Sequence, residues 1–274
     1  MELNKGQVAV VTGAASGIGF ALADAFAAAG LNIVLADVQD DALAAATAKI
    51  EARGVQALAV KTDVSKQDSV EALAAATLQR FGSVNVVCNN AGVAGRGDTW
   101  FGPTANWEWV LGVNLWGVIH GCRLFGAQMA ARGEGGHIVN TASAAAFTPS
   151  RTYGAYATTK AAVLMQTECL RAELASHGIG VTAICPGIVD TGIISATRFV
   201  GTDAAEEAQR RRKTGRLYQL RGFTPDKVAA AIVKAVDRNT AVVPVASDAR
   251  IGQLANRFAP GLTRRFARLD LSPK

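Results

Sequence analysis

The sequence predicts an α/β protein in which one parallel β-sheet is covered by helices on both faces. Strand-like apolar runs alternate with helix-like segments from residue 7 to residue 245. Half of the residues are hydrophobic and only 18% are charged, which is typical of a well-packed globular chain. Repeated β–α units require right-handed crossovers between parallel strands. The expected arrangement is therefore a doubly wound sheet that binds ligands outside the carboxyl ends of its strands.

Each element is assigned from its hydrophobic periodicity and from the residues at its ends. Strands are expected at residues 7–12, 31–37, 55–62, 84–89, 137–141, 180–185 and 241–245. Helices are expected at residues 17–29, 40–53, 66–81, 104–131, 152–177 and 224–238. Gly30, Gly54 and Gly82 follow the first three helices, where glycine is a common C-cap.

Residues 1–274 are expected to form a single domain, since no linker or internal repeat divides the chain. Residues 187–223 lack a clear strand, and a loop of that length in a compact domain is usually a lid or a binding segment. The net charge of the chain is +6, and it is unevenly distributed. Residues 205–274 contain 15 Lys and Arg against 6 Asp and Glu, so this C-terminal quarter alone is strongly positive. The positive charge therefore belongs to the lid and to a basic tail at about 247–274.

The sequence leaves the role of these basic residues open. A solvated helix face is the simplest interpretation, while an anionic substrate or carrier and an anionic membrane are the alternatives. Residues 249–269, interrupted at Pro260, are expected to pack on the domain or on a neighbouring subunit, without forming a stable membrane anchor. Nucleic-acid binding is not expected, because no recognition motif accompanies the charge.

Composition and cysteine usage predict a cytoplasmic protein. The first apolar run, Val8 to Val11, is too short for a signal peptide, and no uncharged apolar stretch reaches the roughly 18–20 residues of a membrane span. The cysteines are expected to be reduced and packed as small apolar groups. No metal site is expected, because the cysteines lack metal-ligand spacing. They are Cys88, Cys122, Cys169 and Cys185.

The turn after the first strand predicts a phosphate-binding loop. It reads Thr12-Gly13-Ala14-Ala15-Ser16-Gly17-Ile18-Gly19 and opens a helix. Glycines allow a close approach of the backbone to a pyrophosphate, and the helix N-terminus offers free N–H groups and positive potential. The expected contacts are Gly13, Ser16, Gly17, Ile18 and Gly19, although a plain tight turn would use the same glycines.

Acidic and amide residues follow the next three strands. Asp37 ends the second strand, where a carboxylate can accept both ribose hydroxyls of adenosine and would repel a 2′-phosphate. No Lys or Arg occupies positions 14, 15 or 38, so NAD is favoured over NADP; an N-cap role for Asp37 is the alternative. Further expected cofactor contacts, which ordinary turn chemistry also explains, are Asp63, Val64, Asn90, Ala91 and Gly92.

Tyr156 and Lys160 are four residues apart on an expected helix and therefore share one face. Reduction of a ketone needs a hydride and a proton from an acid near the carbonyl oxygen. A tyrosine has a pKa of about 10, and a nearby ammonium is expected to lower this pKa toward neutrality. Ser143 ends the preceding strand and is placed to stabilise charge on the substrate oxygen, and Asn114 lies in the long helix before it.

These residues resemble the motifs of the short-chain dehydrogenase/reductase family over nearly the whole chain. The matching motifs are Thr12-Gly13-x-x-x-Gly17-x-Gly19, Asn89-Asn90-Ala91-Gly92, Ser143 with Tyr156-x-x-x-Lys160, and Pro186-Gly187-x-Val189-x-Thr191. The resemblance implies a Rossmann-type sheet of seven strands, commonly in a homotetramer, with a dimer as the smaller assembly.

The resemblance also implies a role for each site residue. Tyr156 would be the acid and base, Lys160 would also bind the nicotinamide ribose, Ser143 would orient substrate, and Asn114 would hold a water in a proton relay. The nicotinamide carboxamide would lie against Pro186, Gly187, Val189 and Thr191.

Three functions are compatible with this sequence. The leading one is an NAD-dependent dehydrogenase of secondary alcohols, with a hydrophobic substrate because residues 94–96, 144–147 and Tyr153 are mostly small, apolar or aromatic. A 3-oxoacyl thioester reductase that docks a carrier on the basic lid is the second. A dinucleotide-sensing regulator or scaffold without catalysis is the third.

Overall fold

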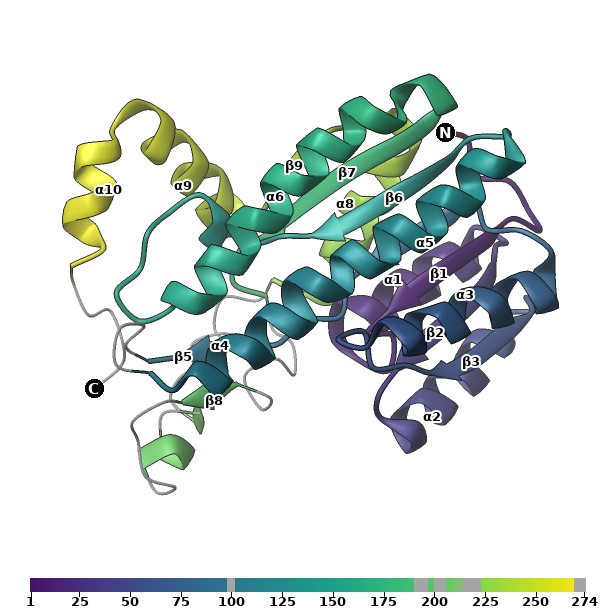
Figure 1. The fold of residues 1–274 in the computed structure, drawn as a ribbon, viewed down its shortest axis with the longest axis horizontal. Coiled ribbons are helices and arrows are strands. Elements are labelled where there is room, and N and C mark those ends of the chain that lie inside the picture. The colour runs from purple at the N-terminus through teal and green to yellow at the C-terminus, as the bar shows by residue number, and fades with distance from the viewer. Residues whose placement is uncertain (98–101, 190–196, 200–205, 210, 213–222, 269–274) are drawn as a thin grey trace.

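A seven-stranded parallel sheet forms the centre of the molecule in the computed structural model (Figure 1). The structure describes residues 1–97, 102–189, 197–199, 206–209, 211–212 and 223–268. The strands of the sheet are β1 Val8–Thr12, β2 Asn32–Asp37, β3 Ala57–Lys61, β4 Val86–Asn89, β6 Gly136–Thr141, β7 Ile179–Pro186 and β9 Val242–Val245. Every neighbouring pair is parallel, so the predicted α/β sheet and all seven expected strands are confirmed.

Helices cover both faces of this sheet. The helices of the chain include α1 Gly17–Ala28, α2 Asp40–Glu51, α3 Gln67–Phe81, α4 Thr104–Leu111, α5 Gly117–Arg132, α6 Gly154–Leu174, α8 Pro225–Arg238, α9 Ser247–Phe258 and α10 Pro260–Phe266. One face packs against α1, α2 and α8, and the other against α3, α5 and α6. Alternate strand residues serve the two cores: Ala9 and Val11 join the first, and Val8 and Val10 the second.

The strand order β3-β2-β1-β4-β6-β7-β9 places the switch in winding direction between β1 and β4. The chain runs outward from β1 to β3 and then returns to lie beside β1 as β4. A crevice opens at such a point outside the carboxyl ends of the strands. The glycine loop after β1 and the Asn90 turn after β4 therefore meet there.

The expected long helix at 104–131 is one helical run with a local irregularity. Residues Gly112–Trp116 between α4 and α5 form a π-helical turn, which contains Asn114. Such widened turns occur often at functional sites. The run Thr104–Arg132 is also long and apolar enough to cross a membrane, but half of its apolar window is buried within the protein, as in a core helix.

Two expectations are corrected by the structure. Residues 187–223 do contain a strand: β8 Arg198–Phe199 pairs in parallel with β5 Gly95–Arg96, a two-residue ladder too short to produce an alternating pattern in the sequence. Cys169 is exposed, whereas the other three cysteines are buried as expected. The basic tail does form helices, α9 and α10, and Pro260 begins the second of them.

Candidate functional site

The loop between β1 and α1 packs tightly against the end of β4. Gly13 and Gly17 have left-handed backbone angles, with φ of +67° and +55°. A Cβ atom at Gly19 would lie 2.0 Å from the Gly13 carbonyl oxygen, and one at Gly13 would lie 2.9 Å from Ala91 Cα. Both approaches are too close for any other residue, so the packing of the chain already requires glycine at these positions.

Thr12 fastens this loop to the turn after β4. Its Oγ1 accepts hydrogen bonds from the backbone N–H groups of Asn90 and Ala91, each at 3.0 Å. The Asn90 side-chain amide in turn donates to the Thr12 carbonyl oxygen at 3.0 Å. Asn90, Ala91 and Gly92 are thereby held beside the glycine loop, although they follow it by more than 70 residues.

The N-terminus of α1 is suited to an anionic group. Ser16 is the N-cap but makes no side-chain capping bond, and the first turn contains no acidic residue. The first N–H groups of a helix have no intrahelical partner and carry a partial positive charge. Ser16, Gly17 and Ile18 therefore fit a phosphate of a dinucleotide.

Asp37 is buried at the carboxyl end of β2. Its Oδ2 accepts from the Ala15 N–H at 3.0 Å, and its Oδ1 accepts from the Gln39 N–H at 3.1 Å. A carboxylate has about four acceptor positions, so capacity remains for the two hydroxyls of a ribose. The N-cap of α2 is Gln39, so the alternative role of Asp37 as a helix cap is wrong.

Asp63 and Val64 serve the local structure of the next turn. Asp63 Oδ1 accepts from the Ser65 N–H at 3.0 Å and from its hydroxyl at 2.7 Å. Val64 is buried, and a Cβ at Gly117 would lie only 2.7 Å from its Cγ2. Turn chemistry and packing against α5 therefore account for the geometry of both residues.

Tyr156, Lys160 and Ser143 come together where α6 crosses the end of β6. Lys160 is almost fully buried, and its Nζ donates to the Thr141 carbonyl oxygen at 2.7 Å. The same Nζ lies 5.7 Å from the centre of the Tyr156 ring. Ser143 lies close enough to the Tyr156 side chain to lower the pKa of its phenol. The three residues thus lie together, and the spacing of four residues accounts for the pairing of Tyr156 with Lys160 on one face of α6.

The electrostatics of this group differ from the expectation. Burial raises the pKa of Tyr156, and the hydrogen bond with Ser143 opposes that rise. Burial also lowers the pKa of Lys160 to about 8. The expected lowering of the Tyr156 pKa is not found, because burial of the phenol outweighs the opposing effect of Ser143.

Asn114 is buried at the π-helical turn, and its side chain is fully engaged. Its Oδ1 accepts from the Val93 N–H at 2.8 Å, while its Nδ2 donates to the Val93 carbonyl oxygen at 2.9 Å and to Thr159 Oγ1 at 3.3 Å. A Cβ at Gly92 would lie 3.4 Å from Asn114 Oδ1 and 3.6 Å from Lys160 Nζ. Asn114 and Lys160 therefore both lie next to Gly92.

The segment after β7 is held by a residue that the sequence did not single out. Asp248, in the first turn of α9, accepts from the Ile188 N–H at 2.9 Å through Oδ2. A Cβ at Gly187 would lie 2.1 Å from its Oδ1. Pro186 ends β7 and Val189 is buried in the core, whereas Thr191 lies outside the described residues.

Aromatic and basic groups border Tyr156 on the substrate side. The Tyr153 and Tyr156 rings meet edge to face with centroids 6.3 Å apart. Arg96 is buried, and its guanidinium lies 5.1 Å from the centre of the Tyr153 ring. The region expected to be mostly small, apolar or aromatic therefore also contains a buried positive charge.

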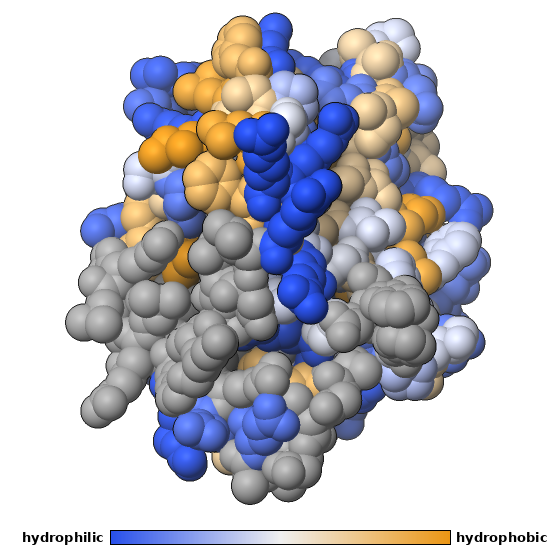
Figure 2. Space-filling view, turned by 90° about the vertical axis from the view of Figure 1, so that its left-hand side faces the viewer, coloured by the Kyte–Doolittle hydropathy of each residue, from blue (hydrophilic) through white to orange (hydrophobic). Residues whose placement is uncertain are grey.

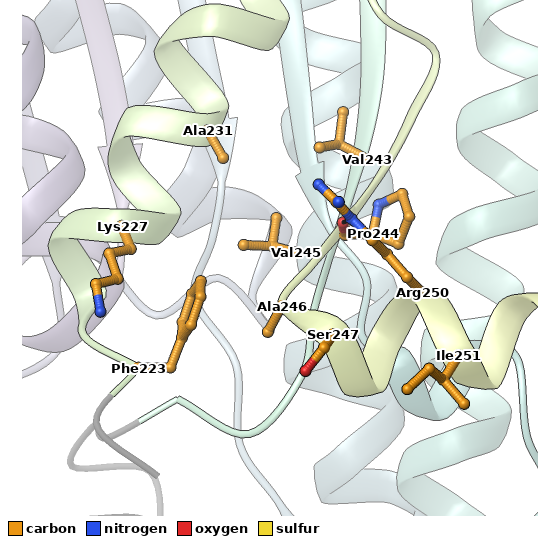
Figure 3. A pocket seen from close by; sticks show the side chains of 10 residues that line it. All are labelled: Phe223, Lys227, Ala231, Val243, Pro244, Val245, Ala246, Ser247, Arg250 and Ile251. Atoms are coloured by element: carbon orange, nitrogen blue, oxygen red, sulfur yellow. Dashed lines mark hydrogen bonds between the residues drawn. The ribbon is translucent and has the colours of Figure 1, made fainter.

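A cavity of about 570 Å³ lies between α8, β9 and α9 (Figure 3). Phe223, Lys227, Val245 and Arg250 are among the residues that line it. None of the expected catalytic residues does. This cavity is therefore separate from the Tyr156 group.

Several contributors to the site could be found only in three dimensions. The acceptor for Lys160 is a backbone carbonyl, and the partner of Asn114 is the peptide of Val93, neither of which has a side-chain signature. Asp248 is 60 residues from Ile188 and looks like any acidic residue in a first helical turn. Of these residues, only Thr12 could be noticed in the sequence, because it directly precedes the first glycine of the predicted phosphate-binding loop.

Comparison with known proteins gives concordant matches. A family model described as short chain dehydrogenase matches residues 7–199. The "probable oxidoreductase EphD" of Mycobacterium tuberculosis is 43% identical over 261 residues, which are 94% of this chain and 44% of that protein. The chain thus spans less than half the length of this relative.

In two further matches, the aligned region covers most of this chain and most of the matched protein. The 1-deoxy-11-beta-hydroxypentalenate dehydrogenase of Streptomyces exfoliatus is 41% identical over 208 residues, 74% of this chain and 76% of the relative. A crystal structure of a short chain dehydrogenase/reductase from Burkholderia phymatum in complex with NAD has a TM-score of 0.87 and 34% identity, covering 100% of this chain and 99% of that one.

The lowered pKa of Lys160 predicts a pH dependence of stability. Below pH 8 the folded and unfolded chains both hold the Lys160 proton, and between pH 8 and the usual lysine pKa of 10.5 only the unfolded chain retains it. The contribution of Lys160 to the free energy of unfolding should therefore rise with pH in this window, by about 2 kcal/mol between pH 7 and pH 9.5. Chemical denaturation of wild type and Lys160→Met at both pH values measures this rise as a growing difference. Lys234→Met, at an exposed site on α8, is the control, and a Lys160→Met curve parallel to wild type would contradict the prediction.

Proposed function

This chain belongs to the short chain dehydrogenase family, and from that premise we propose that it moves a hydride between NAD(H) and a secondary alcohol or its ketone. The observation that carries the proposal is the grouping of Tyr156 with Ser143 and Lys160 at the carboxyl edge of the sheet. The glycine loop and Asp37 lie at the same edge. A proton-transferring group and a dinucleotide cradle at one edge are what such a reaction requires.

The residues of the loop and of β2 would hold NAD. Gly13, Ser16, Gly17, Ile18 and Gly19 would hold the pyrophosphate at the N-terminus of α1. Asp37 would accept the adenosine ribose hydroxyls, and the similarity to a structure that contains NAD supports this choice. When bound, NAD supplies the hydride acceptor of alcohol oxidation.

Further contacts follow from the turns at the other strand ends. Asn90, Ala91 and Gly92 would border the cofactor on the β4 side. Lys160 would bind the nicotinamide ribose. The carboxamide would lie against Pro186, Gly187, Val189 and Thr191. Asp63 and Val64 are the weakest of the proposed contacts, because their local roles already explain them.

Tyr156 would exchange the proton with the substrate oxygen. Because burial raises its pKa, the phenol is protonated at neutral pH, which is the form that donates to a ketone oxygen. Ser143 would hydrogen-bond the same oxygen and stabilise negative charge on it. Since the side chain of Asn114 is engaged by Val93 and Thr159, any relay water would be held by its backbone.

The substrate would be a hydrophobic alcohol or ketone. Phe147 and Tyr153 are partly buried beside the site, and Ala94 is buried. The name of the Streptomyces relative describes a hydroxylated carboxylate as that protein's substrate. The buried charge of Arg96 next to Tyr153 is compatible with an acidic group on the substrate of this chain as well.

The first prediction from the proposed function concerns Tyr156. Tyr156→Phe should lower kcat by about 10²- to 10⁴-fold, because the acid and base is lost, while binding of NADH, followed by its fluorescence, is retained. Tyr153→Phe is the matched control, since the residue four positions later is Ala157 instead of a lysine. A Tyr156→Phe protein with full turnover would remove the proposed role. A protein that binds NADH but turns over no alcohol or ketone would support the scaffold alternative.

The second prediction concerns Asp37. Wild type should prefer NADH over NADPH, and Asp37→Ala should shift the ratio of kcat/KM values by about tenfold or more toward NADPH, because repulsion of the 2′-phosphate is removed. Steady-state kinetics with both cofactors measure the shift. A wild-type preference for NADPH would contradict the proposed cofactor and favour the thioester reductase alternative.

The third prediction concerns Asp248 as a positioning residue. Asp248→Ala should raise the KM for NAD and the Kd for NADH by about tenfold, because the Ile188 N–H loses a charged acceptor, while the KM for the alcohol changes less. Asp226→Ala, in the first turn of α8 and exposed, is the matched control. Equal changes in both KM values would indicate a general structural effect and would contradict the positioning role.

A further inference from the structure

The C-terminal helices α9 and α10 form a hairpin that projects from the body of the protein (Figure 1). The helix α9 packs against β9 and against the short helical turn Ala144–Ala146, and α10 packs against α9. The proposed function uses only Asp248 at the base of this hairpin. The remaining surface of the hairpin therefore has no role in the site described above.

The apolar residues of this hairpin are arranged in the reverse of the usual way. Small residues face the body: Ala249 is fully buried, and a Cβ at Gly252 would lie 3.4 Å from Thr148 Cγ2. Large apolar side chains face outward, with exposed fractions between 51% and 75%. These are Ile251, Leu254, Phe258, Leu262 and Phe266.

The outward residues lie on one side of each helix. At about 100° per residue, Ile251, Leu254 and Phe258 fall within an arc of about 60°, and Leu262 and Phe266 within about 40°. A surface helix normally turns such a stripe toward the core. Exposed apolar patches rimmed by polar residues mark contact with a protein or a membrane.

The charge around this stripe is of one sign. Residues 249–268 contain five arginines and no acidic residue. All five are exposed; they are Arg250, Arg257, Arg264, Arg265 and Arg268. The side of the molecule from which the hairpin projects shows orange apolar atoms next to blue hydrophilic ones (Figure 2).

We propose that the α9–α10 hairpin docks on an anionic lipid surface. An amphipathic helix with aromatic and aliphatic residues on one face and arginines beside them is suited to the boundary between lipid headgroups and acyl chains. Arg250, Arg257 and Arg265 lie about 70–90° from the centre of the stripe on their own helix. From there an arginine can reach the headgroups while its aliphatic stem covers apolar surface. The absence of acidic residues from 249–268 removes repulsion from anionic headgroups.

A second copy of the chain fits this surface less well. A two-fold interface centred on the hairpin would bring the same patch of both subunits together, and its arginines would then find no acidic partner within residues 249–268. Assembly through other faces of the molecule is compatible with the proposal. Docking would also bring the Ser143 side of the site toward the lipid, because α9 packs on the turn that follows Ser143.

The test is sedimentation of the full chain with vesicles. Wild type should sediment with vesicles of phosphatidylglycerol and phosphatidylcholine at low salt, should be released as NaCl is raised, and should stay in solution with phosphatidylcholine alone. Phe258→Ser should weaken the partition about tenfold or more. Replacing Arg257 and Arg265 with Gln should weaken it about fivefold per arginine at low salt.

Met165→Ser is the matched control, because Met165 on α6 and Ile251 on α9 are both 65% exposed. It should bind vesicles as wild type does, whereas Ile251→Ser should bind less. Failure of wild type to sediment with anionic vesicles at low salt would overturn the proposal, as would hairpin variants that sediment like wild type. Light scattering that shows an oligomer dissociated by Phe258→Ser, but not by Met165→Ser, would assign the hairpin to a second copy instead. None of these outcomes depends on catalysis, so the proposed function is tested separately.

Discussion

The close contact between the β1–α1 loop and the end of β4 is the constraint on which the rest of the site depends. Gly13 touches Ala91, Gly19 touches Gly13, and Thr12 bonds to both residues that begin the Asn90 turn. These contacts leave no room for a side chain at Gly13 or Gly19. They bring together two loops at the point where the sheet changes its direction of winding. The geometry of the proposed dinucleotide cradle depends on this contact.

The same joint extends to the group around Tyr156. Gly92 follows Ala91 and lies next to Asn114 and Lys160. Val93 comes next, and its peptide takes both ends of the Asn114 side chain. Asn114 in turn bonds to Thr159, which neighbours Lys160 on α6. A continuous chain of contacts therefore connects the glycine loop to the group around Tyr156.

The segment after β7 is held in place by the C-terminal helix α9. Asp248 occupies the space that a side chain at position 187 would need, and it binds the next backbone N–H. The helix that carries Asp248 also begins the exposed apolar hairpin. Active-site support and the proposed lipid contact thus lie on one element. A surface helix that faces lipid needs firm attachment to the body, and Asp248 together with buried Ala249 provides it.

The sequence by itself determined the seven strands, the order of the helices and the identity of the residues at the strand ends. It could do so because apolar periodicity, glycine at helix ends and local spacing are properties of neighbouring residues. Tyr156 and Lys160 share a helix face for the same reason, and their pairing could be predicted from a spacing of four.

Only the tertiary structure determined the burial, the pKa and the hydrogen-bond partners of these residues. Burial raises the pKa of Tyr156, and the bond from Lys160 to Thr141 directs its ammonium to a backbone carbonyl. The π-helical turn, the two-residue β5–β8 ladder and the contact of Asp248 with residue 188 join segments far apart in the chain. Desolvation and long-range contact depend on how the segments pack, and no local pattern records that packing.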